Sequence, residues 1–502
     1  GIAVEHAEGN RVLVITSCRR VGIAYPDRGG TFQYFPQVEV IGAMSKFSCA
    51  VPSVDRLAEI MRKALRIAFE GRPGVVHVDV PESIMNGSFD LDPSWFRAPE
   101  NYRSLEPVQP SETSIKAAAR MLLEAKRPML HLGSGILHAG ASAIAQEVST
   151  LLQAPITTSW AARATVDERN PTVIPMTFLD AVNDTRRQAD LVLALGSRIG
   201  ESDWWGKPPY WGKVGEQRWI QVDIDAEHLG NIRPVELAVR GDVKLFLERL
   251  ASELRRQGIE SRDLSKRRAF VREMRNACDE RRKTLDEHLE HRGVPMHPAH
   301  VATICQKVFD DDAILVIDGG NTAIWAHFFH EVRTPNTIIT TPKMGMLGAG
   351  VSQAVAAKAA HPDKQVYCII GDGAMGFHSQ EIETAIRNGL HVTYLVLADK
   401  QWGMVKMNQQ FMLKPIKTLV FKALGPDETI NADLCEIEWD ALARAMGGYG
   451  ERVADPDGLE GALRRCLAAE RCSVIHVDVD PVKHMWAPEL LAFKAMHEEP
   501  QG

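Results

Sequence analysis

Two aspartates each end an apolar segment in the second half of the sequence. Asp372 lies between two glycines in "IIGDGAMGF" (369–377), and Asp399 closes "HVTYLVLAD" (391–399). A Gly-Asp-Gly sequence by itself most often marks only a turn, because glycine adopts positive φ and aspartate bonds to nearby backbone. The separation of 27 residues fits one helix plus one strand. A parallel crossover therefore predicts both carboxylates at neighbouring strand ends.

Two carboxylates at the ends of parallel strands suit a small, hard cation. Mg²⁺ prefers oxygen ligands, often takes only one or two carboxylates, and completes its shell with phosphate oxygens and water. In open parallel sheets, ligands bind outside these strand ends, where helix N-termini favour anions. The pattern predicts a metal ion that holds a phosphorylated ligand, with a plain turn at Asp372 as the alternative.

The elements that must position these aspartates follow a rhythm of short apolar runs and helical patterns, which is typical of parallel α/β sheets. The runs form three sets, which include "RVLVIT" (11–16) and "GVVHVDVP" (74–81), "PMLHLGSG" (128–135) and "DLVLALGSRIG" (190–200), and "AILVIDGG" (313–320) and "KQVYCIIGDG" (364–373). We expect an α/β protein with three doubly wound parallel-sheet domains at 1–90, 111–254 and 297–485.

Composition excludes several classes of function. The 502 residues are 45% hydrophobic and 25% charged, as in soluble globular proteins. The formal net charge of −7 argues against nucleic acid or an anionic membrane as a partner. No apolar run approaches the roughly 18 residues of a membrane-spanning helix. The eight cysteines are scattered and never form CxxC, which indicates a reducing, cytoplasmic location.

The third set of segments resembles the thiamine-diphosphate (ThDP) motif. The likeness rests on Gly-Asp-Gly, on the helical pattern "QEIETAIRNGL" (380–390) and on "QWGMVK" (401–406) after Asp399. Elsewhere "GRPGVVHVDVPESI" (71–84), "RPMLHLGSG" (127–135) and "IQVDIDAEHLGNIRPVELAVRGDVK" (220–244) are similar to the acetolactate synthase and pyruvate decarboxylase family. The resemblance covers nearly the whole chain. It implies a pyrimidine-binding, a central Rossmann-like and a diphosphate-binding domain, with ThDP and Mg²⁺ as cofactors.

The resemblance also implies roles for single residues. Asp372 and Asp399 match the two side-chain ligands of Mg²⁺, and the backbone carbonyl of Gln401 matches the third ligand. Leu347 matches the bulky residue that bends the thiamine, and the carbonyl of Gly345 would accept a hydrogen bond from its aminopyrimidine. The positions implied to contact the diphosphate are Gly320, Asn321, Gly373, Ala374, Gly403 and Met404.

The sequence departs from the family pattern at two places. The family usually has Asn-Asn where this chain has Ala398-Asp399, so Asp399 adds a negative charge beside the diphosphate. That charge would either weaken cofactor binding or tighten Mg²⁺. The glutamate that activates ThDP in the family falls upstream of the segment matching Gly1, so no catalytic residue is assigned to that role. We expect the first domain to be truncated at its N-terminus, with absence of the acid as the alternative.

Several questions stay open at this point. His378 either meets substrate near the cofactor or caps the helix start after Asp372. The glycines of "HLGSGILHAG" (131–140) either bind FAD, as in some relatives, or form an ordinary tight turn, which we prefer.

The expected activity is cleavage or ligation of a C–C bond on a small 2-oxo acid or aldehyde. Acetolactate synthase-like carboligation is preferred, because "QWGMVK" and "VVHVDVP" are closest to that branch. The alternatives are sulfoacetaldehyde acetyltransferase-like activity, a 2-hydroxyacyl-CoA or benzaldehyde lyase-like activity, and a catalytically inactive regulatory paralogue. Relatives share the cofactor between two chains, which implies a homodimer or homotetramer.

Overall fold

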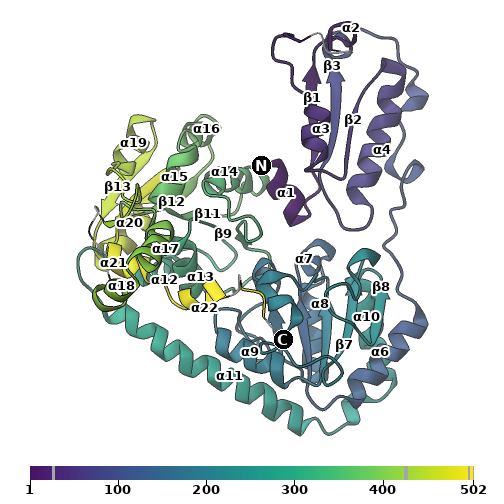
Figure 1. Cartoon of the computed structure of the whole chain (residues 1–502), viewed down its shortest axis with the longest axis vertical. Coiled ribbons are helices and arrows are strands. Elements are labelled where there is room, and N and C mark those ends of the chain that lie inside the picture. Colours follow the sequence, from purple (N-terminus) through teal and green to yellow (C-terminus); the bar gives the residue numbers. More distant parts are fainter. Residues whose placement is uncertain (25–28, 423–424, 426–427, 496–497, 501–502) are drawn as a thin grey trace. The chain divides into compact units, whose positions relative to one another are not determined.

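The computed structural model describes residues 1–24, 29–422, 425, 428–495 and 498–500, which form two compact units (Figure 1). The first unit holds residues 1–109 together with 224–227 and 240–242, and the second holds the rest of the chain. Among the described residues, none of the helices combines the length and the apolarity that a membrane span requires.

The first unit is built on a three-stranded parallel sheet in the order β1-β3-β2. Its strands are β1 (Leu13–Cys18), β2 (Phe47–Ala50) and the fully buried β3 (Val76–Pro81). Its helices are α1 (Ile2–Glu8), α2 (Val21–Ala24), α3 (Gln37–Gly42), α4 (Leu57–Phe69) and α5 (Glu82–Met85). Ile60, Ala64 and Ala68 of α4 share one apolar cluster with the valines of β3, and the two small alanines let the helix approach the sheet.

The second unit contains a five-stranded central sheet in the order β5-β4-β6-β7-β8. The strands are β4 (Pro128–Leu132), β5 (Ile156–Thr158), β6 (Leu191–Leu195), β7 (Arg218–Asp223) and β8 (Leu237–Arg240). One face packs on α6 (Glu112–Glu124), α8 (Ser142–Leu152) and α10 (Val243–Arg256). The other face packs Met129 and Val192 against Trp211 and Trp219. Two further helices belong to this region: α7 (Gly135–Ala139) directly follows β4, and α9 (Leu179–Gln188) directly precedes β6.

A six-stranded parallel sheet forms the C-terminal half of this unit, in the order β10-β9-β11-β12-β14-β13. The strands are β9 (Ile314–Asp318), β10 (Ile338–Ile339), β11 (Val366–Gly371), β12 (Val392–Ala398), β13 (Tyr449–Val453) and β14 (Ser473–Asp478). Helices α12 (Ala299–Val308), α13 (Asn321–Phe329) and α20 (Pro456–Ala468) pack on one face. The other face is covered by α14 (Ala349–Ala360), α16 (Glu381–Arg387) and α19 (Trp439–Ala445).

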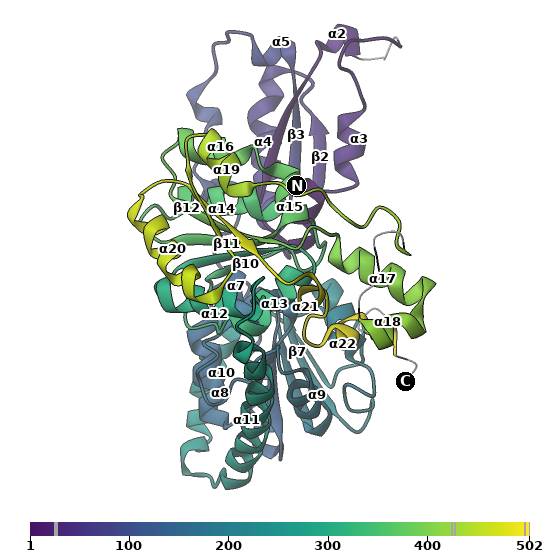
Figure 2. The same ribbon diagram turned by 90° about the vertical axis from the view of Figure 1, so that its left-hand side faces the viewer.

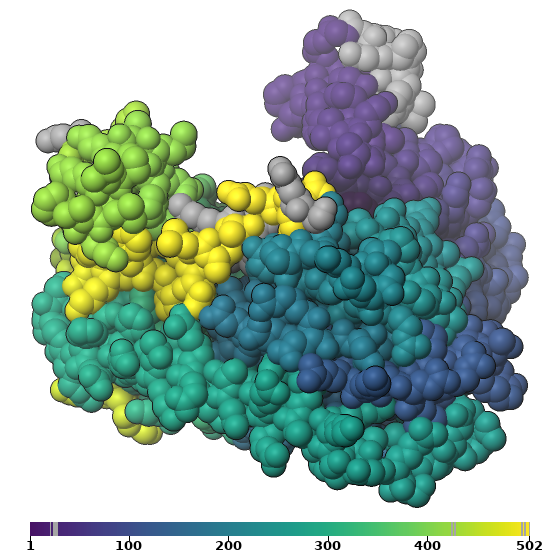
Figure 3. Space-filling view, turned by 60° about the horizontal axis from the view of Figure 1, so that its bottom comes forward, coloured from purple at the N-terminus to yellow at the C-terminus, as the bar shows by residue number. Residues whose placement is uncertain are grey.

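The remaining helices are α11 (Ser265–Asp286), α15 (Asp372–His378), α17 (Gly403–Leu413), α18 (Pro415–Phe421), α21 (Pro481–Met485) and α22 (Leu490–Ala495). Helices α17 and α18 lie in the yellow-green surface lobe of Figure 3. There Met412, Ile416 and Phe421 are 84%, 79% and 66% exposed. The connecting helix α11 packs Phe270 and Met274 against α9.

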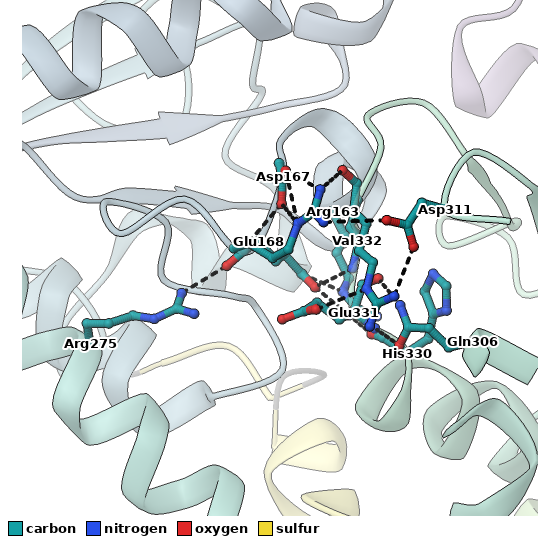
Figure 4. Close-up of polar contacts among 11 residues, drawn as sticks. Arg163, Asp167, Glu168, Arg275, Gln306, Asp311, His330, Glu331 and Val332 are labelled. Carbon is teal, nitrogen blue, oxygen red and sulfur yellow. Dashed lines mark hydrogen bonds and ion pairs between the residues drawn. The ribbon is translucent and has the colours of Figure 1, made fainter. Parts of the chain in front are cut away.

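One buried ion pair joins the central and C-terminal parts of the second unit (Figure 4). Arg163 contacts both carboxylate oxygens of Glu168 and donates a hydrogen bond of 2.6 Å to the carbonyl of His327, at the end of α13. Glu168 in turn accepts a hydrogen bond from the backbone N–H of Val332 at 2.9 Å. These contacts hold the C-terminal end of α13 against the central sheet region.

The expectation of three parallel α/β sheets is confirmed. The second and third sheets lie in one compact unit, and the residue limits 1–90, 111–254 and 297–485 remain predictions.

Candidate cofactor and metal site

Asp372 and Asp399 follow two adjacent strands of the C-terminal sheet. Strand β11 pairs in parallel with β12, and Gly371 is directly opposite Leu397. Asp372 is therefore the first residue beyond β11, and Asp399 the first beyond β12. Both are buried, with 8% and 7% of their surfaces exposed. The crossover inferred from their spacing is thus present, and it places the two acids at the same edge of the sheet.

Asp372 is oriented by backbone groups. The N–H groups of Gly373 and Lys400 donate to its two carboxylate oxygens at 2.7 and 2.8 Å. Burial, and after it the negative charge of Asp399, raise the pKa of Asp372 to about 6. The two carboxylates therefore repel each other in a poorly solvated place, and a shared cation would remove that repulsion.

Asp399 is oriented mainly by side chains. Its Oδ2 lies 2.7 Å from Nδ1 of His484, on α21, and accepts a hydrogen bond of 3.1 Å from Nε2 of Gln401. Its Oδ1 has a longer contact of 3.4 Å with the backbone N–H of Gln401. Oδ1 is thus the less engaged of the two oxygens.

The segment that carries Asp399 is held in a fixed turn. Lys400 has a φ of 59°, in the left-handed region that few non-glycine residues adopt. The residues on either side of Gln401 each make a backbone hydrogen bond of 2.8 Å. The carbonyl of Lys400 accepts from the N–H of Leu434, and the N–H of Trp402 donates to the carbonyl of Ala432. This pairing fixes the direction of the backbone at Gln401.

Two helix N-termini lie next to each other at this edge. Helices α13 and α17 begin at Asn321 and Gly403, and neither has a side-chain cap on its terminal N–H groups. A Cβ at Gly403 would lie 2.8 Å from Nδ2 of Asn321, and one at Gly320 would lie 3.3 Å from Cβ of Met404. Glycine at 320 and 403 therefore lets the two helix starts approach. Uncapped N–H groups of this kind attract anions such as phosphate.

These residues fit the metal and diphosphate that the sequence suggests. Two close carboxylates offer oxygen ligands to a cation, and two adjoining helix starts offer donors to an anion. A small cradle is kept open by glycine, since a Cβ at Gly373 would lie 2.6 Å from the ring of Trp402. Ala374 is buried in the same turn of α15.

The segment before α14 reaches the site through the end of α15. Gly348 has a φ of 85°, and its carbonyl lies 3.1 Å from Nδ1 of His378. Gly345 has a φ of 55° and is exposed, whereas Leu347 packs on the apolar cluster under α14. His378 is half-buried, and its contact connects α15 to this loop. The roles of Gly345, Leu347 and His378 toward a ligand remain predictions.

Sequence reasoning missed Asp318 and His484. Asp318 ends β9 and accepts hydrogen bonds from Gly319 N–H at 2.6 Å and Gly350 N–H at 2.7 Å. It orients the loop before α13, and its place after an apolar strand is the same signal that identified Asp372. His484 lies 85 residues from Asp399 in the sequence, and no local sequence pattern indicates that the two are in contact.

Another group of side chains has the composition of a metal site. Among the described residues, Glu436, His476 and Asp478 place ligand atoms within 4.8 Å of one another. Arg452, however, donates to both oxygens of Asp478 at 2.7 and 2.8 Å and also contacts Glu436. Lys400 also contacts Glu436, at 3.1 Å, so two cations balance the two carboxylates, and we interpret the group as an ion-pair network.

The glycines after β4 have a packing explanation. A Cβ at Gly133 would lie 2.1 Å from the carbonyl oxygen of Gly196, and one at Gly135 would lie 2.7 Å from its Cα. Gly140 ends α7 with a φ of 61°. Close approach of two backbones and a left-handed helix end account for all three positions, and binding of FAD remains a prediction.

Comparison with known proteins identifies two family models that match this chain. Residues 318–477 match the family model "Thiamine pyrophosphate enzyme, C-terminal TPP binding domain", and residues 115–250 match "Thiamine pyrophosphate enzyme, central domain". Together the two models span more than half of the chain.

Curated relatives extend the similarity over most of the chain. The large subunit of acetolactate synthase isozyme 2 from Escherichia coli (strain K12) is 27% identical over 467 residues, which cover 90% of this chain and 77% of that protein. The large subunit of isozyme 1 from the same organism is 29% identical, over 89% of this chain and 75% of that protein. Human 2-hydroxyacyl-CoA lyase 1 is 26% identical, over 93% and 78%. Because both family models match and the similarity to curated relatives covers most of the chain, the chain belongs to the thiamine pyrophosphate enzymes.

Proposed function

We propose that this protein is a ThDP- and Mg²⁺-dependent enzyme that cleaves or forms a C–C bond next to the carbonyl of a 2-oxo acid or aldehyde. One observation carries the proposal: two buried carboxylates lie at neighbouring strand ends, and Oδ2 of Asp399 would lie 3.5 Å from a Cβ on Gly403, where the uncapped N-termini of α13 and α17 meet. Acetolactate synthase-like carboligation is the favoured reaction, supported by the similarity to acetolactate synthase large subunits.

The residues of this chain would divide the binding work. Asp372, Asp399 and the carbonyl of Gln401 hold the cation. The backbone groups around the diphosphate are those of Gly320, Asn321, Gly373, Ala374, Gly403 and Met404. Leu347 would support the thiamine, and the carbonyl of Gly345 would accept a hydrogen bond from its aminopyrimidine. When bound, the cofactor supplies the electron sink for the carbanion that C–C cleavage leaves. We assign the activating glutamate to no residue of this chain.

Cofactor binding tests the site directly. We expect calorimetry to detect ThDP binding that depends on Mg²⁺ and that Asp372→Asn weakens by about tenfold or more, since even groups behind a metal ligand contribute 10–100-fold. Asp363→Asn is the matched control, because Asp363 is exposed and precedes β11 at the opposite edge of the sheet. Equal affinity in the two variants would exclude Asp372 as a ligand.

Turnover separates the candidate reactions. Conversion of pyruvate to acetolactate would support the favoured reaction. Cleavage of a 2-hydroxyacyl-CoA would favour the alternative to which the human relative points. Release of sulfite from sulfoacetaldehyde, with transfer of the acetyl group that results, would indicate the third activity. Tight, Mg²⁺-dependent cofactor binding without any of these would favour the inactive regulatory paralogue.

We further propose a cytoplasmic homodimer or homotetramer. All eight cysteines are free, which agrees with a reducing location. Light scattering on the purified protein measures the assembly. The visible absorption spectrum of the same sample tests FAD, which we do not expect.

A further inference from the structure

The negative charge at Asp399, where the family usually has asparagine, has a buried partner. Nδ1 of His484 lies 2.7 Å from Oδ2 of Asp399, and the two side chains are only 5% and 2% exposed. The histidine belongs to α21, which contacts both α13 and α17 (Figure 2). The pair therefore joins the turn after β12 to a helix that follows the last strand of the sheet.

His484 is itself fixed from the other side. Its Nε2 lies 3.0 Å from the hydroxyl of Thr322, in the first turn of α13. Its carbonyl accepts a hydrogen bond of 2.9 Å from the indole of Trp325, and Asn321 donates to the next carbonyl, that of Met485. A neutral imidazole satisfies both ring contacts, because Nδ1–H can donate to Asp399 while Nε2 accepts from the hydroxyl of Thr322.

The side chains around Oδ2 of Asp399 favour a hydrogen-bond acceptor at that position. Oδ2 meets the His484 ring and also the amide Nε2 of Gln401, whose orientation is fixed by a second bond of 2.8 Å to the carbonyl of Pro481. An asparagine at 399 that placed its NH₂ at this position would oppose the amide NH₂ of Gln401, and His484 could accept from it only by moving its proton from Nδ1 to Nε2. With the opposite amide orientation, an asparagine at 399 would point its NH₂ group toward the cation.

We propose that His484 is a positioning residue for the metal site. It holds Oδ2 of Asp399 so that Oδ1 is presented to the cation, and its hydrogen bond stabilises the added negative charge. Aspartate at 399 and histidine at 484 thus act as a matched pair. The inference rests on the proposed binding of Mg²⁺ and ThDP at this edge of the sheet.

Four variants test the pair by Mg²⁺ affinity, measured by calorimetry with saturating ThDP: His484→Phe, His484→Asn, Asp399→Asn and the double variant of Asp399→Asn with His484→Phe. His484→Phe keeps a ring but removes both nitrogens, and we expect its Kd for Mg²⁺ to rise about 10–100-fold, the usual effect of a group that orients a metal ligand. His484→Asn keeps a nitrogen near the Nδ1 position, and its Kd should stay within about threefold of wild type. In Asp399→Asn the added His484→Phe should change the Kd by less than about threefold, because the hydrogen bond to the carboxylate is already absent.

A matched control separates positioning from general damage. His476 is also a fully buried histidine at the same sheet, but it faces Asp478 and not the candidate site. His476→Phe should therefore leave the Kd for Mg²⁺ unchanged, whatever it does to the thermal midpoint. Equal rises in His476→Phe and His484→Phe would overturn the inference, as would an unchanged Kd in His484→Phe.

The single variant Asp399→Asn keeps the test decisive if His484→Phe folds poorly. Loss of Mg²⁺ affinity in Asp399→Asn, although asparagine is usual there in the family, would support the matched pair, and unchanged or tighter binding would overturn it. Failure of the proposed function looks different, because wild-type protein would then show no Mg²⁺-dependent ThDP binding at all.

Discussion

Arg163 and Glu168 form a two-point ion pair, with Nε–Oε1 and Nη2–Oε2 distances of 2.9 and 3.0 Å, inside the second unit. The two side chains are 3% and 5% exposed. Arg163 also donates to carbonyls at the end of α13, whose other end adjoins the candidate site. The pair therefore connects the central sheet region to the helix that presents Asn321.

Breaking this pair on one side should be costly. Glu168→Gln leaves a buried guanidinium without its counter-charge, and we expect a loss of about 3 kcal/mol in the free energy of unfolding. Urea denaturation measures it. Arg163→Met combined with Glu168→Gln should cost less than the two single losses added together, because no lone charge remains. Strict additivity would show that the pair is not coupled.

Glycine at 373 is expected to be needed for cofactor binding. In Gly373→Ala the new Cβ would lie 2.6 Å from the ring of Trp402, closer than real contacts allow, so the tryptophan must move. We expect the Kd for ThDP, measured by calorimetry, to rise about tenfold, as for other residues that support a bound group.

Gly376 supplies the matched control in the same helix. A Cβ there would meet nothing closer than 3.9 Å, and alanine favours the helix by up to about 1 kcal/mol. Gly376→Ala should therefore bind ThDP as wild type does and unfold at an equal or higher temperature. A similar loss of affinity in both variants would show that α15 tolerates no change, and that the Trp402 contact is not the cause.

Asp318 should be required for the loop before α13. Asp318→Asn replaces one acceptor oxygen by a donor that faces the N–H of Gly319 or Gly350, so one hydrogen bond is lost and two donors oppose each other. We expect a loss of about 1–3 kcal/mol in unfolding free energy and weaker ThDP binding. Unchanged stability and unchanged binding, by urea denaturation and calorimetry, would contradict this role.

The strands that carry the site could be predicted because they are central and parallel. β11 and β12 are buried along their whole length, so their sequences are nearly continuous apolar runs that stop at an acid. β13 was not predicted, because "YGERV" lies at a sheet edge and is mostly half-buried, which gives no clear apolar pattern. The two strand-ending acids were therefore readable, and an edge strand was not.

The contacts around the acids could not be predicted from the chain alone. His484 reaches Asp399 only because α21 follows β14, which lies beside β12 in the sheet. The periodicity of a local sequence does not indicate the order of strands in a sheet. The same holds for Arg163 and His327, which are 164 residues apart. Asp318 is different, since "VIDGG" carries the same strand-end signal as Asp372, although the resemblance implies roles in this loop only for Gly320 and Asn321.

Stability should depend on pH through His297. This residue is 2% exposed and lies among the rings of His288, His291 and Trp325, at 5.0 to 5.5 Å. Burial, and then the charges of neighbouring basic groups, lower the pKa of His297 to about 3. The unfolded chain, with a histidine pKa of about 6.5, binds the proton more readily. The contribution of His297 to the free energy of unfolding is thus complete above about pH 6.5 and is lost as the pH falls toward 3.

At about pH 5 the loss from His297 alone should be about 2 kcal/mol relative to neutral pH. His297→Asn keeps an acceptor for the N–H of Ala299, which Nδ1 now accepts at 3.3 Å, but it does not titrate. Urea denaturation at both pH values should therefore show a smaller loss in His297→Asn than in wild type. His361→Asn, at an exposed histidine, should keep the wild-type loss. Parallel losses in wild type and His297→Asn would mean that His297 accepts a proton in the folded state without cost.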